Sequence, residues 1–465
     1  MKRVLIITYY WPPSGGSGVQ RWLKFAKYLP QFNWEPIIYT PLNPDVNSLD
    51  KSLSKDVSEN LIILKKKIWE PYGFYKALLG KGNKHASGEE KANTNIKANI
   101  IADSSKTSLF HKISLFIRGN FFIPDPRCFW IKPSVKYLSK WLEENKVDAI
   151  VSTGPPHSMH LIAKRLSKKT NIPWIADFRD PWTEIFYFKH LKLTSFANKK
   201  HKRLEQSVLD NASKVIVVSK KMQKEFEKRT STPIEVITNG FDPDDFSSKI
   251  DTLPKEGEIK LWQAPIDTDK DYFTLTHTGI FVDNGNPNYL WSVLKEKCAE
   301  DPLFKEQLRI RLIGQVDDTV LKCIIDANLE DNLINMGYMP HNKAILYQKS
   351  AWALLLPLRK EPEAGAILTG KFFEYLASGR KILAFGPIDG DLALALKETQ
   401  SGNIVDFQDK EGIRKEIDVL YNTFLEQGKL DIWDIRTTDQ LKDSILKYSR
   451  KNLTERLSQL LNNLN

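Results

Sequence analysis

Short apolar runs rich in β-forming residues alternate with helical stretches from one end of the sequence to the other. This alternation is typical of βα units wound around parallel sheets. In the first half we expect strands over Val4–Thr8, Pro36–Thr40, Ala149–Ser152, Trp174–Asp177, Val215–Ser219 and Glu235–Thr238. In the second half we expect strands over Thr274–His277, Arg309–Gly314, Leu333–Met336, Trp352–Pro357, Ile382–Phe385 and Asn403–Val405. The clearest helices between them are Val19–Leu29, Ser195–Asp210, Pro287–Ala299 and Gly370–Ser378.

The length of 465 residues exceeds that of an ordinary single domain, so the sequence predicts two doubly wound α/β domains. We place them at residues 1–240 and 271–465, with a linker over 241–270 where Asp, Pro and Lys crowd the sequence. The last helix is a candidate to return to the first domain. Residues 80–107 are polar and rich in Lys, Asn and Ser, which predicts a mobile insertion.

Cysteine content and hydropathy narrow the class of protein. Three widely spaced cysteines cannot form a disulfide framework and show no metal-ligand spacing, so we expect a reducing, cytoplasmic setting and no metal. The first residues lack the apolar core of a signal peptide, and no run of about 18 apolar residues follows. The sequence therefore predicts no membrane span.

The two halves of the chain differ in net charge. Residues 1–240 hold 40 lysines and arginines against 21 aspartates and glutamates, whereas residues 241–465 hold 28 against 36. The sequence shows no pattern typical of nucleic-acid recognition, so nucleic acid is not expected as a partner. Basic, aromatic-bearing stretches flank the insertion, with Trp69 beside Lys65–Lys67 and with Phe116 and Ile117 beside Arg118. They favour peripheral binding to an anionic membrane surface, although helices with an ordinary core-facing side would look the same.

The loop after the first expected strand is rich in glycine. Gly15, Gly16 and Gly18 would let backbone N–H groups approach an anion at the start of the next helix. This suits a diphosphate or an anionic acceptor, with Arg21 on the same helix as a further candidate. A plain tight turn is the alternative.

A second candidate segment follows the strand at Ala149–Ser152. His157 comes where strand gives way to helix, at the carboxyl edge where open α/β sheets bind ligands, and a neutral imidazole there can bind a sugar hydroxyl. The alternative is that His157 only caps the helix. For His160, one turn further on, a structural role is favoured.

The strand Trp174–Asp177 ends in a cluster of charge. Asp177, Arg179 and Asp180 suit recognition of hydroxyl groups, and a buried structural Asp–Arg pair explains them almost as well. Further along, Asn239 and Gly240 indicate a turn or hinge.

The segment 357–385 combines a strand end, a loop with Gly365 and Ala366, and a helix that presents Lys371 and Glu374 on one face. Lys371 could neutralise a phosphate, and Glu374 could accept hydrogen bonds from a ribose diol. The alternative is a surface ion pair between these two side chains.

Taken in order, these segments resemble a retaining GT-B glycosyltransferase of family 4. The most specific pieces are Thr-Asn-Gly-Phe-Asp at 238–242, followed by Phe246, and Lys-x-x-Glu-Tyr-Leu-Ala-Ser-Gly-Arg-Lys-Ile-Leu at 371–383. The resemblance implies two Rossmann-like domains facing a central cleft, with the acceptor on the first domain and a nucleotide-diphosphate sugar on the second. It implies no bound cofactor.

The resemblance also implies roles for the residues that match. His157 would bind the transferred sugar or stabilise charge as the glycosidic bond breaks, and Asp177 is the second catalytic candidate. The donor would meet Gly15, Gly16, Arg359, Gly365, Ala366, Lys371 and Glu374, with the ribose on Glu374. The acceptor side would comprise Gly18, Arg21, Arg179 and Asp180. We assign no nucleophile.

Two positions depart from the family pattern. Ala366 replaces the glutamate that commonly precedes the ribose-binding residue by eight positions, although Glu363 and Gly365 offer a re-registered Glu-x-Gly. The usual Arg and Lys-Gly pair is missing after Gly279, so diphosphate charge would fall to Lys371, Arg359 or Lys360. We therefore expect a hexosyl or related transferase acting on a lipid-linked or surface-polysaccharide acceptor. A nucleotide-sugar epimerase and a non-catalytic nucleotide-binding scaffold remain alternatives.

Overall fold

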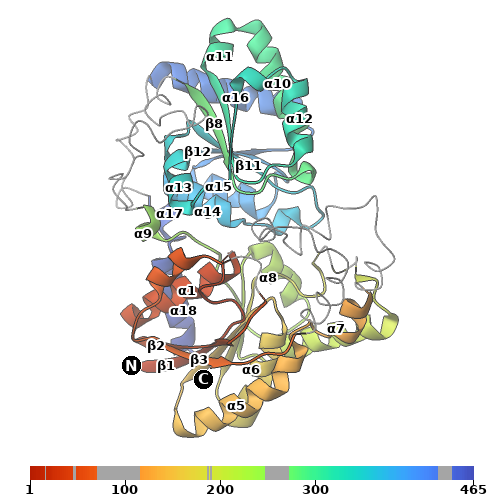
Figure 1. The fold of residues 1–465 in the computed structure, drawn as a ribbon, viewed down its shortest axis with the longest axis vertical. Coiled ribbons are helices and arrows are strands. Elements are labelled where there is room, and N and C mark those ends of the chain that lie inside the picture. Colours follow the sequence, from red (N-terminus) through yellow and green to blue (C-terminus); the bar gives the residue numbers. More distant parts are fainter. Residues whose placement is uncertain are drawn as a thin grey trace, which may run out of the picture. The chain divides into compact units, whose positions relative to one another are not determined.

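The computed structural model describes residues 1–15, 17–45, 49–70, 116–185, 188, 191–246, 272–427 and 442–464. The chain divides into two compact units, which are described separately here (Figure 1). The first comprises Met1–Thr238 together with Leu453–Asn465, and the second comprises Asn239–Asn452.

The first unit is built on a parallel sheet that has seven strands within the described residues, in the order β3-β2-β1-β4-β5-β6-β7. The strands are β1 (Lys2–Ile7), β2 (Trp34–Pro41), β3 (Ile62–Lys66), β4 (Ala149–Gly154), β5 (Trp174–Phe178), β6 (Lys214–Val217) and β7 (Ile234–Val236). The order reverses beside β1, which has β2 on one side and β4 on the other. In open parallel sheets, ligands bind at the carboxyl ends of strands at such a reversal.

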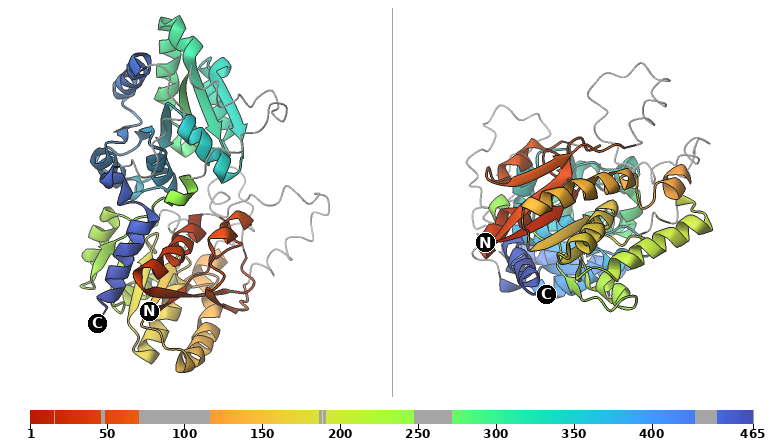
Figure 2. Two further views of the ribbon diagram at one scale, coloured as in Figure 1. Left: turned by 90° about the vertical axis from the view of Figure 1, so that its left-hand side faces the viewer. Right: turned by 90° about the horizontal axis from the view of Figure 1, so that it is seen from below.

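Helices cover both faces of this sheet. The helices are α1 (Ser17–Tyr28), α5 (Ile131–Glu144), α6 (Ser158–Thr170), α7 (Ser195–Leu209), α8 (Lys220–Glu227) and α18 (Arg450–Asn462). Because side chains alternate along a strand, Val4 and Ile6 pack with α1 and α18 while Leu5 and Ile7 pack with α5 and α6. Figure 2 shows α18 beside this unit from two further directions.

The second unit repeats the plan with six parallel strands among the described residues, in the order β10-β9-β8-β11-β12-β13. They are β8 (Phe273–Thr278), β9 (Leu308–Ile313), β10 (Leu333–Gly337), β11 (Ala353–Pro357), β12 (Lys381–Phe385) and β13 (Gly402–Val405). Strand order reverses between β8 and β11. The loops that follow these two strands therefore lie at the expected ligand edge of this unit.

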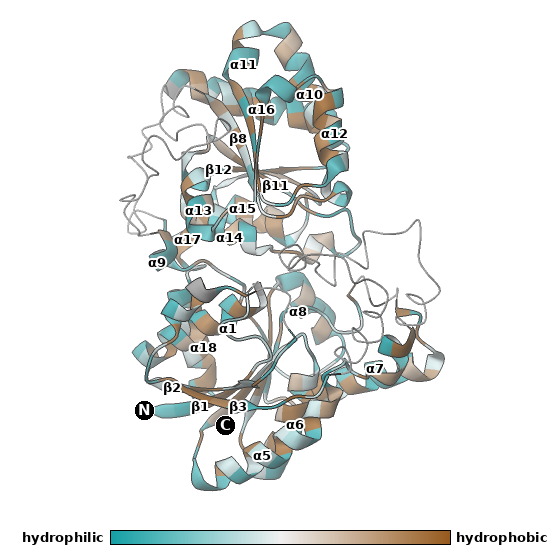
Figure 3. Cartoon of the chain, in the orientation of Figure 1, coloured by the Kyte–Doolittle hydropathy of each residue, from teal (hydrophilic) through white to brown (hydrophobic). Residues whose placement is uncertain are grey.

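Two groups of helices sandwich the second sheet. One face packs against α10 (Asn288–Glu300), α12 (Asp318–Asp326) and α16 (Lys410–Gln427). The other packs against α13 (His341–Ser350), α14 (Gly370–Ser378), α15 (Asp391–Thr399) and α17 (Asp443–Leu446). Two short helices, α9 (Pro243–Phe246) and α11 (Pro302–Gln307), also belong to this unit. Apolar residues concentrate on the strands, as the brown ribbon in Figure 3 shows.

The two Rossmann-like sheets confirm the GT-B fold class expected from the sequence. Every expected strand is present, with ends shifted by a few residues. The sequence analysis missed β3, an edge strand whose side chains are only half-buried, and Lys65 and Lys66 belong to it. The expected insertion at 80–107 lies outside the described residues, as does most of the expected linker.

Candidate functional site

In the first unit, the glycine-rich loop after β1 runs into α1. Gly15 is half-buried, and Gly16 lies outside the described residues. Gly18 has no room for a side chain, since a Cβ there would lie 2.9 Å from Arg179 Nη1 and 3.1 Å from Tyr10 Cδ2. The tight contact explains glycine at this position whether or not the loop binds an anion.

Arg21 of α1 and Asp177 at the end of β5 form a fully buried ion pair. Arg21 Nη2 lies 2.8 Å from Asp177 Oδ1, and the guanidinium also donates to the carbonyls of Ile237 and Thr238. Asp177 Oδ2 accepts from Trp22 Nε1 at 2.7 Å and from Thr153 Oγ1 at 2.8 Å. These donors outweigh the cost of burial and hold the pKa of Asp177 below its usual value.

The geometry around Asp177 is that of a buried structural Asp–Arg pair, with Arg21 as the partner, which is the alternative to a role in binding hydroxyl groups. Its carboxylate is engaged by a guanidinium, an indole and a hydroxyl, and both members of the pair have almost no exposed surface. This arrangement fastens α1 to β5 and to the residues after β7. The catalytic role predicted for Asp177 and the acceptor-side role predicted for Arg21 remain predictions, and a structural role accounts for every contact described here.

Arg179 joins the two loops at the switch point of the sheet. Its guanidinium donates from Nη1 to the Gly18 carbonyl at 3.1 Å and from Nη2 to the Pro155 carbonyl. Its Nε is buried and has no hydrogen-bond partner within the described structure. Neighbouring Asp180 is half-buried. Arg179 therefore fixes the glycine-rich loop against the loop that carries His157.

His157 occupies the N-cap position of α6, but its side chain makes no capping hydrogen bond. Asp125 performs that task, because its Oδ2 accepts from the Ser158 backbone N–H at 2.8 Å and its Oδ1 accepts from the Ser158 hydroxyl. The structure therefore does not support the alternative that His157 serves only as a helix cap. Burial holds the pKa of His157 well below its usual value, so the imidazole is neutral at physiological pH.

Trp182 supports the His157 ring, and sequence reasoning missed it. The two rings are parallel, with centroids 4.6 Å apart. Trp182 Nε1 donates to His201 Nδ1 at 3.1 Å, and its backbone N–H donates to the buried carboxylate of Glu205 at 3.1 Å. A fixed aromatic surface under an imidazole restrains its orientation without using either ring nitrogen.

In the second unit, Lys371 lies at the start of α14 and reaches the end of β8. Its Nζ lies 3.1 Å from His277 Nε2 and donates to the Ile280 carbonyl at 2.8 Å. His277 Nδ1 lies 3.0 Å from the Leu355 carbonyl, so Nδ1 carries the proton and Nε2 accepts from lysine. Gly279 has positive φ, and a Cβ there would lie 2.7 Å from Lys371 Cε.

Burial lowers the pKa of Lys371 to about 7, with Arg359 lowering it further and Glu374 opposing the shift. No ion pair joins Lys371 to Glu374, so the alternative of an i,i+3 surface pair is wrong. Arg359 is half-buried, and its guanidinium makes no hydrogen bond or ion pair with another described residue, although its carbonyl accepts from the Glu361 backbone N–H at 2.9 Å. Lys371 and Arg359 thus bring two basic groups to the ends of β8 and β11.

Glu374 presents its carboxylate one turn along α14. Oε1 lies 3.2 Å from His341 Nε2, and Oε2 accepts from Gln348 Nε2 at 3.3 Å. The same amide donates to Thr278 Oγ1 at 3.1 Å, which ties the carboxylate to the end of β8. About a quarter of the Glu374 side chain stays exposed, so it can receive a ligand. Sequence reasoning missed His341 and Gln348 because both lie on α13.

The loop between β11 and α14 contains a short 3-10 helix, η10 (Ala364–Ala366). Gly365 is buried against the turn at Gly390, where a Cβ would lie 2.9 Å from the Gly365 carbonyl oxygen. Ala366 is half-buried. Glu363 Oε2 is buried without a hydrogen-bond partner among the described residues. Glu363 and Glu361 are therefore the acidic residues of this loop, and the position of Ala366 carries no charge.

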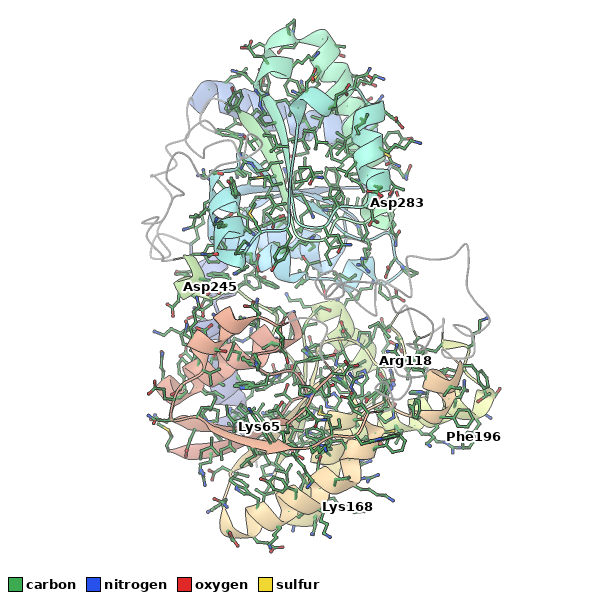
Figure 4. All side chains as sticks on the ribbon, viewed as in Figure 1. Lys65, Arg118, Lys168, Phe196, Asp245 and Asp283 are labelled. Carbon is green, nitrogen blue, oxygen red and sulfur yellow. The ribbon has the colours of Figure 1, made fainter. Side chains whose placement is uncertain are left out.

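An exposed aromatic strip also lies on the first unit. Its ring contacts run from Trp69 to Phe129 to Phe122, and Asn120 binds the Lys192 carbonyl and Thr194 at the start of α7. Phe121 and Phe196 are 71% and 75% exposed, and Figure 4 labels Phe196. The contributing segments 116–122, 128–142 and 191–203 contain lysine and arginine but no aspartate or glutamate.

Metal binding and membrane spanning find no support in the part of the chain that the structure describes. Within that part, no group of three or more His, Cys, Asp or Glu side chains is placed to hold a metal ion. Among the described helices, none is long and apolar enough to cross a membrane.

Comparison with known proteins finds one family model that matches part of the chain. Residues 92–245 match the model of Glycosyltransferase Family 4. The matched stretch lies almost wholly in the first unit and includes His157, Asp177 and Arg179. No curated protein sequence matches the chain.

Solved structures extend the likeness to the whole fold. Sucrose-phosphate synthase from Thermosynechococcus elongatus superposes with a TM-score of 0.59 at 13% identity, over 100% of this chain and 99% of that one. TarM from S. aureus, in complex with fondaparinux, α-GlcNAc-glycerol and UDP, gives 0.54 at 14% identity over 99% and 100%. WaaG, a glycosyltransferase involved in lipopolysaccharide biosynthesis, gives 0.52 at 10% identity over 99% and 100%. The family match and the shared GT-B fold together support a glycosyltransferase.

Proposed function

We propose that this protein transfers a sugar from a nucleotide-diphosphate sugar to a lipid-linked or saccharide acceptor, with retention of the anomeric configuration. The observation that carries the proposal is the group at the end of β8 and the start of α14. There the positioned amino group of Lys371, with a pKa of about 7, lies one turn from a partly exposed carboxylate, Glu374. A cation and a carboxylate at that spacing suit the two polar parts of a nucleoside diphosphate.

Each group has a definite task in this proposal. Glu374 accepts hydrogen bonds from the ribose hydroxyls, while Lys371 and Arg359 neutralise the diphosphate in place of the missing Arg and Lys-Gly pair. His157, neutral and held against Trp182, donates a hydrogen bond to a hydroxyl of the transferred sugar. TarM binds UDP, and a trehalose-6-phosphate protein from E. coli with a similar fold binds UDP-2-fluoro glucose, which supports a donor of this class.

The transfer step follows from these tasks. The bond between the anomeric carbon and the diphosphate oxygen breaks, and the diphosphate leaves with the electron pair. The acceptor hydroxyl forms its bond on the same face of the sugar and passes its proton to a departing diphosphate oxygen. Lys371 and Arg359 stabilise the charge that develops on the leaving group.

We further propose that the exposed aromatic strip binds an anionic membrane surface on the cytoplasmic side. Phe121 and Phe196 would insert among lipid headgroups, and the basic segments around them would meet negative charge. The likeness to WaaG, which is involved in lipopolysaccharide biosynthesis, supports an acceptor at a membrane. Surface attachment would bring the enzyme to a lipid-linked acceptor without a membrane-spanning helix.

The test is to incubate the protein with a panel of nucleotide-sugars, with and without a lipid extract that contains usable acceptor. Release of nucleoside diphosphate is measured. We expect release that rises with the extract. The Glu374→Gln variant should bind the nucleotide about 10- to 100-fold more weakly, since it loses charge-assisted hydrogen bonds worth about 1.5–3 kcal/mol. Glu361→Gln is the matched control on the preceding loop. Isomerised donor without extract would indicate an epimerase, and binding without turnover would indicate a scaffold.

A further inference from the structure

Two imidazole nitrogens at the end of β4 are buried without a hydrogen-bond partner in the described structure. They are His157 Nδ1 and His160 Nε2. Both side chains are more than nine-tenths buried. Both nitrogens face Gly154, because a Cβ there would lie 2.5 Å from His160 Nε2 and 3.0 Å from His157 Nδ1. Two polar atoms that converge on a glycine need an explanation, because an unsatisfied buried group costs about 1–3 kcal/mol.

The other nitrogen of His160 fixes which of its atoms carries the proton. Trp174 Nε1 can only donate, and it donates to Ser152 Oγ at 2.8 Å. Ser152 Oγ is fully buried and lies 2.8 Å from His160 Nδ1, its only other side-chain partner among the described residues. If His160 Nδ1 held the proton, the serine hydrogen would have no acceptor. The hydroxyl therefore donates to Nδ1, and the His160 proton is on Nε2.

Both imidazoles are neutral, so each has one donor and one acceptor nitrogen. Burial lowers the pKa of His160 to about 3 and holds that of His157 well below its usual value. The two ring centroids lie 5.8 Å apart, and His160 Nε2–H faces the same glycine as His157 Nδ1. The N–H is satisfied if His157 Nδ1 accepts, directly once the rings approach or through one bound water. The proton of His157 then lies on Nε2.

We propose that His160 is a positioning residue that sets the tautomer of His157 through a hydrogen-bond chain from Trp174 and Ser152. The chain ends in a His157 Nε2–H group that can donate but cannot act as a base. Gly154 is required because any side chain there would separate the two rings. This inference rests on the proposed function for its catalytic consequence, though the tautomer itself does not depend on activity.

The test is nitrogen NMR of the full-length protein labelled with ¹⁵N-histidine, with the His157 and His160 signals assigned from His157→Gln and His160→Gln. We expect both rings as Nε2–H tautomers between pH 6 and 8, with the His157 Nδ1 signal shifted as a hydrogen-bond acceptor. His160→Leu should abolish that acceptor shift, while His160→Gln, which keeps an N–H donor, should largely preserve it. A His157 proton on Nδ1, or a His157 signal unchanged by His160→Leu, would overturn the proposal.

A second pair of variants tests the chain from its buried end. Ser152→Ala should move the nitrogen signals of both rings, while Ser134→Ala, which deletes an equally buried hydroxyl bonded to Tyr39, should move neither. With a working donor, we expect about a tenfold lower kcat in His160→Leu, an unchanged KM for the donor, and partial recovery in His160→Gln. If the wild-type tautomers are as expected but no sugar is transferred, the chain stands and only the proposed function fails.

Discussion

The charge state of Lys371 predicts how nucleotide affinity depends on pH. With a pKa of about 7 in the free protein, its side chain is an ammonium below pH 7 and a neutral amine above it. His277, Glu374 and Arg359 are the ionisable groups that face it. A bound diphosphate favours the ammonium, so the apparent affinity should follow the fraction of Lys371 that is protonated before binding.

The magnitude follows from that fraction. Half of the lysine is protonated at pH 7 and about 1% at pH 9, so the dissociation constant should rise about fifty-fold between these pH values. The terminal phosphate of the free nucleotide has its second pKa at about 6, so it is about nine-tenths ionised at pH 7 and contributes little to the change. Lys371→Arg should bind with little dependence on pH, because a guanidinium stays charged. Lys371→Met should bind weakly at both pH values.

The measurement is isothermal titration calorimetry with UDP, and with ADP and GDP if UDP does not bind. Repeating it in buffers of different ionisation enthalpy gives the protons taken up on binding, which should approach one at pH 8 in the wild type and zero in Lys371→Arg. A flat wild-type profile between pH 7 and 9 would refute the reasoning. A slope that persists in Lys371→Arg would assign it to another group.

Three further perturbations test separate parts of the first unit. Arg21→Met leaves its carboxylate partner buried without a cation, so the first unit should lose about 3–5 kcal/mol of unfolding free energy, measured by urea titration of tryptophan fluorescence. Trp182→Leu removes the surface under the His157 ring and should lower kcat up to about tenfold with unchanged nucleotide affinity. Replacing Phe121 and Phe196 together by serine should weaken binding to vesicles containing anionic lipid by about tenfold or more, whereas Tyr338→Ser, an equally exposed change in the second unit, should not.

The rule that ligands bind at the carboxyl ends of parallel strands located several candidate residues, but it did not locate the side chains that contact them. His157 and Lys371 follow strands that the apolar pattern locates, so their place at a ligand edge could be predicted. The positions of Trp182 beside His157 and of His341 beside Glu374 could not be predicted, because both side chains come from segments whose packing depends on the whole fold. The same rule applied to His277, just before Gly279, would have found the partner of Lys371.

Strand β3 and the hydrogen-bond partners of Asp177 are two features that the sequence pattern does not display. Strand β3 is an edge strand with half-buried side chains and two lysines, so its hydropathy resembles that of a loop or a surface helix. The saturated hydrogen bonding of Asp177 is likewise invisible in sequence, since its donors come from α1 and β4. A strand-end carboxylate has the same sequence pattern whether it faces a ligand or an internal arginine.

The return of the chain to the first unit has a consequence for biosynthesis. Leu453, Leu457 and Leu461 are buried in the core beside β1 and α1, although Asn239–Asn452 intervene as a separate unit. The ribosome must therefore complete the second unit before the first can close its own core. Until then the apolar residues that this last helix covers stay open to solvent, so the nascent protein should be a client of chaperones while residues 239–452 are being made.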